Sequence, residues 1–171
     1  MNIIKQLSRI TALVITLTML TGLFAGCASP GGKMRNMSTM EIVKDMGLGI
    51  NLGNTFESTG SWINSSSVTN YETGWGSPVI TEDIIKGYAK EGFTTLRVPV
   101  AWSNMMSGDY DINPDYLARV RQVIDWALDS DMYVIMNIHW DGGWWEKFSG
   151  KDKDECMHKY ERIWTQLTKE F

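Results

Sequence analysis

Three short apolar runs alternate along the chain with longer segments in which apolar residues recur at helical spacing. The runs cover residues 48–52, 94–100 and 132–138, and such continuous runs are typical of strands covered on both faces. The polar stretch 53–78 is predicted to be a functional loop. Helical spacing behind capping residues predicts helices over residues 38–46, 81–92 and 113–130, and a last helix is predicted from about residue 154 to residue 171. The last helix is expected to bury Cys156, Tyr160, Ile163, Trp164 and Leu167.

The repeated order of strand and helix predicts an α/β fold with a parallel sheet. Two architectures share that order. A doubly wound sheet would carry a glycine-rich turn after its first strand, but Gly47-Leu48-Gly49 precedes that strand. The sequence therefore favours a (β/α)8 TIM barrel, of which the chain holds the first three βα units. Functional groups of such barrels collect where strands end, here at residues 51–54, 97–99 and 137–140.

The first 27 residues have the order of an export signal. Lys5 and Arg9 precede the apolar residues 10–25, and small residues lead into Cys27, so residues 1–27 are predicted to be a signal peptide. The segment Leu23-Phe24-Ala25-Gly26-Cys27 resembles a bacterial lipobox, in which Cys27 is lipidated. An ordinary secretory signal and a retained anchor helix are the alternatives. Residues 28–37 are then a linker, and residues 38–171 a domain exported to the bacterial surface, to the periplasm or into the medium.

Composition excludes two classes of protein. With 171 residues, 43% of them hydrophobic, and a net charge of -4, the chain is too apolar to be disordered and lacks the basic surplus of a nucleic-acid-binding protein. We therefore expect no nucleic-acid partner, and membrane contact only through the signal or lipid anchor. Cys156 is expected to be a buried free thiol, because a disulfide to Cys27 would compete with lipidation. His158 lacks metal-ligand spacing and is predicted to be a solvated residue without a carboxylate partner, so neither metal nor cofactor is expected.

Two polar residues at the strand ends are candidates for chemistry. Arg97 stands inside an apolar strand, where its guanidinium must meet a carboxylate or other acceptors. An ion pair that serves stability alone is the alternative. His139 ends the third run, and Trp140, Trp144 and Trp145 follow it. A hydrogen-bonded core histidine is possible there, but flat indole faces are the usual platforms for sugar rings, and eight Trp residues exceed what a small core requires.

Four blocks of the sequence resemble the strand signatures of glycoside hydrolase family 5. They read GINLGNTFE, ETGWGSP, GFTTLRVPVAW and NIHWDGGW, and they occupy residues 49–57, 72–78, 92–102 and 137–144. Within the family, the resemblance is to bacterial endo-β-1,4-glucanases and xyloglucanases. It implies a retaining β-glycosidase on a β/α barrel that degrades a β-glucan polysaccharide. Cellulose, xyloglucan, mixed-linkage glucan and mannan remain open as the substrate.

The resemblance also implies roles for particular residues. Arg97 is implied to hold the nucleophile carboxylate in its ionised form, and His139 to line the cleavage subsite. Asn54 and Glu57 are implied to bond to sugar hydroxyls. Groups that stack on or line the sugar chain are implied at Trp75, Trp140 and Trp144.

The chain departs from the family pattern in two respects. Many members carry a second histidine where Trp140 stands. The general acid of the family lies in an Asn-Glu-Pro motif after the fourth strand and the nucleophile is a glutamate after the seventh, but this sequence has no Asn-Glu pair. Glu57, Glu72 and Glu146 do not occupy the family positions of the general acid or the nucleophile.

Retaining hydrolysis needs two carboxyl groups about 5 to 5.5 Å apart. We therefore expect the chain to be a truncated part of an endo-glucanase, inactive by itself and monomeric within the complete protein. The alternative is a non-catalytic glucan-binding surface lipoprotein, for which loops lined with Trp would suffice.

Overall fold

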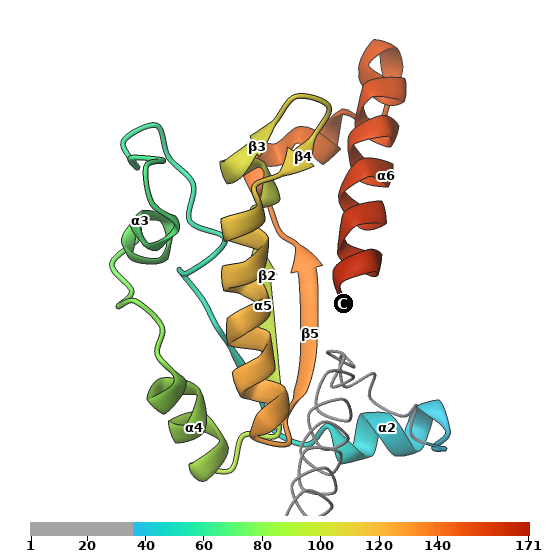
Figure 1. Cartoon of the computed structure of the whole chain (residues 1–171). Helices are drawn as coiled ribbons and strands as arrows, with labels where there is room; N and C mark the ends of the chain where they lie inside the picture. The colour runs from blue at the N-terminus through green and yellow to red at the C-terminus, as the bar shows by residue number, and fades with distance from the viewer. Residues whose placement is uncertain (1–35) are drawn as a thin grey trace, which may run out of the picture. The chain divides into compact units, whose positions relative to one another are not determined.

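Three parallel strands form the central sheet of the computed structural model (Figure 1). Leu96 of the middle strand stands in register with Ile50 on one side and Val134 on the other, so all three strands end on the same side of the sheet. This arrangement is the one predicted for consecutive βα units. In spatial order the strands are β1 (Gly49–Asn51), β2 (Thr95–Val100) and β5 (Tyr133–Ile138).

The structure describes residues 36–171. The predicted signal peptide with Cys27 and most of the predicted linker lie outside the described residues. Residues 38–171 form one compact unit. No helix within the described range is long and apolar enough to cross a membrane.

Three of the four predicted helices begin at the capping residues that predicted them. Ser38 and Glu41 form a reciprocal capping box, Thr81 accepts a bond from the backbone of the helix it precedes, and Asn113 does the same in front of Pro114. Each helix lies within a few residues of its predicted range, so these predictions are confirmed. The four are α2 (Thr39–Asp45), α4 (Glu82–Lys90), α5 (Pro114–Asp129) and α6 (Lys153–Glu170).

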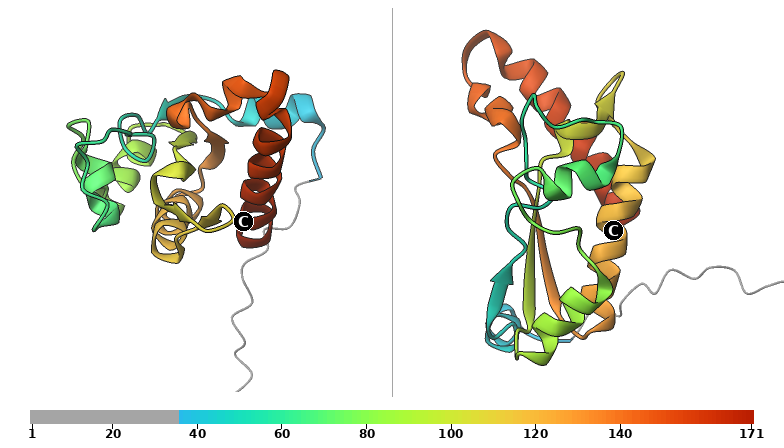
Figure 2. Two further views of the ribbon diagram at one scale, coloured as in Figure 1. Left: turned by 90° about the horizontal axis from the view of Figure 1, so that it is seen from above. Right: turned by 90° about the vertical axis from the view of Figure 1, so that its left-hand side faces the viewer.

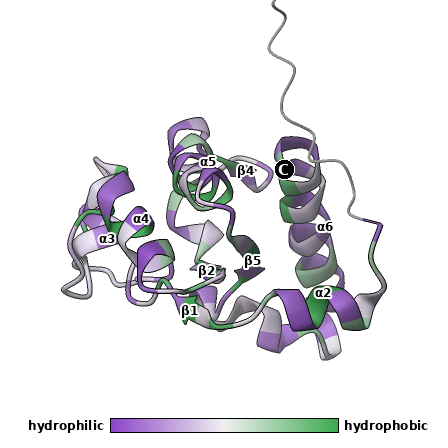
Figure 3. Ribbon diagram, turned by 90° about the horizontal axis from the view of Figure 1, so that it is seen from below, coloured by the Kyte–Doolittle hydropathy of each residue, from purple (hydrophilic) through white to green (hydrophobic). Residues whose placement is uncertain are grey.

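Helices α4, α5 and α6 cover one face of the sheet (Figure 2). Successive side chains of a strand point to opposite faces, and Leu96, Val98 and Val100 of β2 point toward the helices, where they are fully buried. Figure 3 shows the mixture of apolar and polar residues along α5 and α6 that such half-buried helices need. The helices contribute Ile85, Tyr116, Val120, Val123, Ile163 and Leu167 to this core.

The opposite face of the sheet is only partly covered within residues 36–171, although Thr95 and Pro99 of β2 are buried there. Ile135 of β5 is 42% exposed, and Gly49 and Asn51 of β1 are exposed as well. The prediction of strands covered on both faces is therefore wrong for the described part of the chain, since only one face meets helices. In α6 the burial of Cys156, which is a free thiol, Ile163 and Leu167 is confirmed, whereas Tyr160 is exposed and Trp164 only half-buried.

The segment predicted to be a polar loop over residues 53–78 is more ordered than expected. It contains α3 (Val68–Thr73), and it buries Phe56, Tyr71 and Glu72. The Glu72 carboxylate makes two bonds to the Arg119 guanidinium, at 2.8 and 2.9 Å, and also accepts a bond from the backbone N–H of Ile80. Polar composition concealed this packing because the partner charge lies on the distant helix α5.

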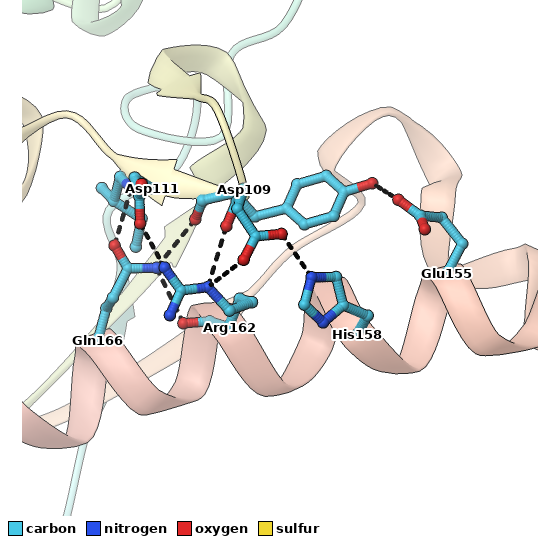
Figure 4. Close-up of polar contacts among 8 residues, drawn as sticks. Asp109, Asp111, Glu155, His158, Arg162 and Gln166 are labelled. Atoms are coloured by element: carbon cyan, nitrogen blue, oxygen red, sulfur yellow. Dashed lines mark hydrogen bonds and ion pairs between the residues drawn. The ribbon is translucent and has the colours of Figure 1, made fainter.

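Sequence analysis missed a short hairpin between β2 and α5. Its strands are β3 (Met106–Ser107) and β4 (Asp111–Ile112), and it follows the 3-10 helix η1 (Trp102–Met105). Figure 4 shows polar side chains of α6 that hold the hairpin: Arg162 bonds to Asp109 and Asp111, and His158 lies 2.5 Å from Asp109. The prediction that His158 has no carboxylate partner is therefore wrong. Two further 3-10 helices, η2 (Asp141–Lys147) and η3 (Gly150–Asp152), lead from β5 into α6.

Candidate active site

Arg97 extends from the middle of β2 on the face opposite to the helices. Its Nη1 donates to Oδ1 of Asn51 at 2.5 Å, and its Nη2 lies 3.3 Å from Nδ1 of His139. Asn51 is the β1 residue in register with Arg97, and His139 directly follows β5. One polar side chain from each of the three strands therefore meets at this place.

The contact with the guanidinium concerns one ring nitrogen of His139. A guanidinium has only donors, so in this hydrogen bond Nδ1 of His139 accepts and the ring N–H is the one on Nε2. The prediction that Arg97 meets acceptors is confirmed, and these acceptors are neutral. Within residues 36–171 no carboxylate forms an ion pair with Arg97. The result is a positive group with a histidine N–H beside it, which suits binding of hydroxyl or carboxylate oxygens.

Asn51 is a site residue that sequence analysis did not single out. Besides its bond to Arg97, its Nδ2 lies close to Gly53, where an added Cβ would come within 2.9 Å. Gly53 thus leaves room for the Asn51 amide. The signal was available, because Asn51 ends its strand and Arg97 lies within the next, both on the face that alternation assigns away from the core.

Glu57 organises the turn after β1. Its Oε1 accepts the backbone N–H of Asn54 at 2.7 Å and its Oε2 that of Thr55 at 3.0 Å, while the residue itself is only 6% exposed. Asn54 has φ of +57°, a conformation that Asn tolerates better than most residues, and its side chain is exposed. The structure therefore gives Glu57 a role in holding this turn and leaves the Asn54 amide open to solvent.

The three predicted tryptophans have different surroundings. Trp75 is 40% exposed, and its Nε1 donates to the Thr59 carbonyl at 3.0 Å. Trp140 is 50% exposed and follows His139. Trp144 is half-buried, packs against the core and carries the Lys159 ammonium over its ring at 4.8 Å. Trp75 and Trp140 are therefore better placed than Trp144 to offer an open ring face.

Asp141 is a buried carboxylate that sequence analysis also missed. It accepts bonds from the backbone N–H and hydroxyl of Ser103, at 2.9 and 2.8 Å, and from Nε1 of Trp144 at 2.8 Å. Lys159 in turn donates to the Ser103 hydroxyl. Burial raises the pKa of Asp141, and the bonds from Trp144 and Ser103 oppose that rise. Asp141 thereby ties the turn after His139 to η1 and α6.

The assembled groups can bind and orient a polar ligand. Glu57 is occupied by backbone N–H groups and Glu72 by Arg119, so neither stands free to act as an acid or a nucleophile. Glu146 is exposed beyond β5. Among residues 36–171 no three His, Cys, Asp or Glu side chains are grouped closely enough to hold a metal ion.

Comparison with protein families shows the family of this chain. The family model described as cellulase (glycosyl hydrolase family 5) matches residues 56–171, which include Arg97, His139 and the Trp residues after it. The chain belongs to glycosyl hydrolase family 5. Solved structures similar to it are described as endoglucanases of subfamily 4 of this family.

Individual relatives cover most of this chain but are much longer. Endoglucanase A of Paenibacillus barcinonensis is 35% identical over 164 residues, which is 91% of this chain and 40% of that protein. A broad-specificity endoglucanase from Ruminococcus champanellensis with bound cellotriose is 33% identical with a TM-score of 0.76, over 81% of this chain and 41% of that one. The chain thus spans about two fifths of these relatives.

A third relative was solved with a longer ligand. A family 5 enzyme from Prevotella bryantii in complex with a xyloglucan tetradecasaccharide is 30% identical with a TM-score of 0.72, over 78% of this chain and 40% of that chain. The likeness to these enzymes confirms that the three βα units are part of a TIM barrel.

Proposed function

We propose that this chain supplies the substrate-binding strand ends of an endo-β-1,4-glucanase. The observation that carries the proposal is the meeting of Asn51, Arg97 and His139, one from each strand, on the face that the helices leave free. Relatives solved with cellotriose and with a xyloglucan oligosaccharide support a β-glucan as the ligand. In this proposal Arg97 keeps the nucleophile carboxylate ionised, and Nε2 of His139 donates to an oxygen in the cleavage subsite.

The turn after β1 and the exposed indoles position the sugar in this proposal. Asn54 bonds to a sugar hydroxyl through its exposed amide, and Glu57 sets the shape of the turn that presents it. Trp75 and Trp140 offer ring faces on which the axial C–H groups of glucose units pack. Trp144 lines the site in this proposal, and its bond to Asp141 holds the indole in place.

The chemistry requires two carboxyl groups that we place outside this set of residues. One must protonate the leaving oxygen while the other attacks the anomeric carbon, at a separation of about 5 to 5.5 Å. Since Glu57 and Glu72 are engaged in backbone and arginine contacts, we propose that the chain by itself binds β-glucan without hydrolysing it.

Calorimetry and an activity assay together test this function. We expect the chain to bind cellotriose and to release no reducing sugar from carboxymethylcellulose. Arg97→Ala should weaken binding by about tenfold, because a hydrogen bond to a charged group is worth about 1.5 to 3 kcal/mol. Arg121→Ala, an arginine on the outer helix α5, is the matched control and should bind as the parent does. Equal binding by the Arg97 variant, or hydrolysis by the chain alone, would contradict the proposal.

We also propose that the protein is exported and anchored by a lipid on Cys27. A β-glucan polymer does not enter the bacterial cell, so an enzyme that cleaves it must act outside the cytoplasm. Labelling of cells with radioactive palmitate should mark the parent chain and leave Cys27→Ala unlabelled. Equal labelling of the two proteins would rule out lipidation at this residue.

A further inference from the structure

The outer surface of the segment between β1 and α4 carries no charge. Residues 53–78 contain only two ionisable side chains with a charge at neutral pH, Glu57 and Glu72, and both are buried with their oxygens bonded. Ser, Thr, Asn and Gly residues, Pro78 and two indoles make up the exposed surface. Figure 1 shows this segment on the side where the strands end. A neutral surface rich in hydroxyl and amide groups favours a neutral polar ligand over a nucleic acid or a charged peptide.

Trp62 is the most exposed indole of the described residues, at 72%. Its six-membered ring lies flat on Gly60: a Cβ added to that glycine would meet three ring atoms at 2.5 to 2.6 Å. Contact with several ring atoms at nearly equal distance means that Gly60 supports one face of the ring. The other face is open to solvent. The ring is therefore held in place without being covered.

Trp75 rests on the same short segment. Its Nε1 donates to the carbonyl of Thr59, the residue before Gly60. The segment is itself fixed, because the Ser58 carbonyl accepts a bond from Asn104 at 2.8 Å and the Gly60 carbonyl accepts one from Ile63 at 3.1 Å. Two exposed indoles are thus anchored on neighbouring residues of one ordered segment.

We propose that Trp62, supported by Gly60 on the segment that also anchors Trp75, is a stacking platform for an additional glucose unit of a β-linked glucan chain. Glucose units in β-1,4 linkage present flat faces of C–H groups, which pack on an aromatic face, while their hydroxyls bond to neutral polar groups such as those around Trp62. Because Gly60 already holds the Trp62 ring in one orientation, less side-chain entropy is lost when the ligand binds. The inference rests on the proposed function, since it extends the same glucan chain beyond the units held near Arg97 and His139.

Calorimetry with a short and a long ligand tests the platform. The whole chain is titrated with cellotriose and with cellohexaose, as the parent and as Trp62→Ala, Trp62→Phe and Gly60→Ala. Trp62→Ala should weaken cellohexaose binding by about tenfold and leave cellotriose binding within about twofold, as expected for loss of one aromatic contact. Trp62→Phe should retain most of the affinity. Gly60→Ala should behave like Trp62→Ala although the indole is still present, because the new methyl group displaces the ring.

Met40→Ala is the control, because Met40 is 76% exposed on α2, before the first strand and away from the strand ends. Unfolding curves of all variants check that the fold is retained. If cellohexaose binds the parent and Trp62→Ala equally well, the platform inference is overturned and the proposed function stands. If neither ligand binds the parent, both are overturned. Tighter binding of an oligogalacturonate than of cellohexaose through Trp62 would overturn the assignment to a neutral glucan.

Discussion

The two faces of the same three-stranded sheet differ in almost every physical respect. Toward the helices, β2 presents Leu96, Val98 and Val100, all fully buried. Toward the other side it presents Arg97, whose neighbours include Asn51 and the 42% exposed Ile135. A single strand therefore contributes to stability through one set of alternate residues and, in the proposed function, to ligand binding through the other.

The polar face also contains a buried hydrogen-bond acceptor without a donor. Oδ1 of Asn137 is buried and has no partner among the described residues, while its Nδ2 donates to the Ile138 carbonyl. A buried acceptor without a donor costs free energy, on the order of 1 to 3 kcal/mol. The helix-facing side of the strands carries no polar side chain in this state. On the helix-covered side the atoms in this state are the indole Nε1 groups of Trp102 and Trp164, which are donors, so the free acceptor of Asn137 is particular to the polar face.

The largest effect should come from the buried ion pair on the packed side. Arg119→Ala would leave Glu72, which is fully buried, with an uncompensated charge, and the expected loss of unfolding free energy is about 3 to 5 kcal/mol. The exposed pair of Lys86 with Glu82 provides the control, for which Lys86→Ala should cost about 0.3 to 0.5 kcal/mol. Urea unfolding followed by Trp fluorescence measures both. Similar losses in the two variants would mean that Glu72 is not the buried anchor of this segment.

A second experiment compares the two faces directly. Leu96→Ala removes a side chain from the packed face and should lower the unfolding free energy by about 2 to 5 kcal/mol. Ile135→Ala makes a comparable truncation on the open face, where the side chain is already 42% exposed, and should cost less than half as much. The same urea titration measures both variants. An equal cost would show that the open face is covered in solution.

Much of this division could be predicted from the sequence, because capping residues and apolar spacing depend only on neighbours along the chain. Ser38 with Glu41, and Asn113 with Pro114, marked helix starts that the structure confirms. Arg97 was recognised for a similar reason, as one charge inside an apolar run. The resemblance of the surrounding motifs to family 5 added the barrel.

The features that were missed depend on partners far away in sequence. Glu72 looked like a loop residue until α5 placed Arg119 beside it, and the hairpin around Asp109 is held by α6. Asp141 gave no periodic signal, since it is bonded to the distant Ser103 as well as to the nearby Trp144. The apolar runs led to the wrong prediction that both faces of the sheet are covered. Such a run indicates that a strand tends to be buried, but it does not identify the elements that bury it.

A third prediction concerns Asp141, which holds the turn after β5. Asp141→Asn keeps the shape of the side chain but replaces one acceptor oxygen by an NH2 group, which then faces donors from Ser103 and Trp144. We expect a loss of about 1 to 3 kcal/mol in unfolding free energy. Cellotriose affinity should fall as well, because the turn begins two residues after His139. Measuring both quantities distinguishes the cases: a stability loss with unchanged affinity would confine Asp141 to a structural role.

The smallest effect should come from the exposed contact between Asp109 of the hairpin and His158 of α6, which we call the clamp (Figure 4). The bond to Asp109 raises the pKa of His158 above its ordinary value of 6.5, with a smaller contribution from Glu155 and an opposing one from Arg162. The same bond lowers the pKa of Asp109 below 3.8. The clamp is therefore complete only where His158 is protonated and Asp109 is ionised.

The signs of the two shifts define a pH window for this clamp. The contribution of His158 is fully present below pH 6.5 and is lost as the pH rises through its higher folded pKa. The contribution of Asp109 is present above pH 3.8 and is lost as the pH falls through its lower folded pKa. The difference in melting temperature between the parent and His158→Gln should thus be greatest near about pH 5 and disappear near about pH 9, and added salt should reduce it because both groups are exposed. NMR titration of the His158 ring gives an independent measurement, and a pKa at or below 6.5 would show that the ring does not hold the hairpin through its charge.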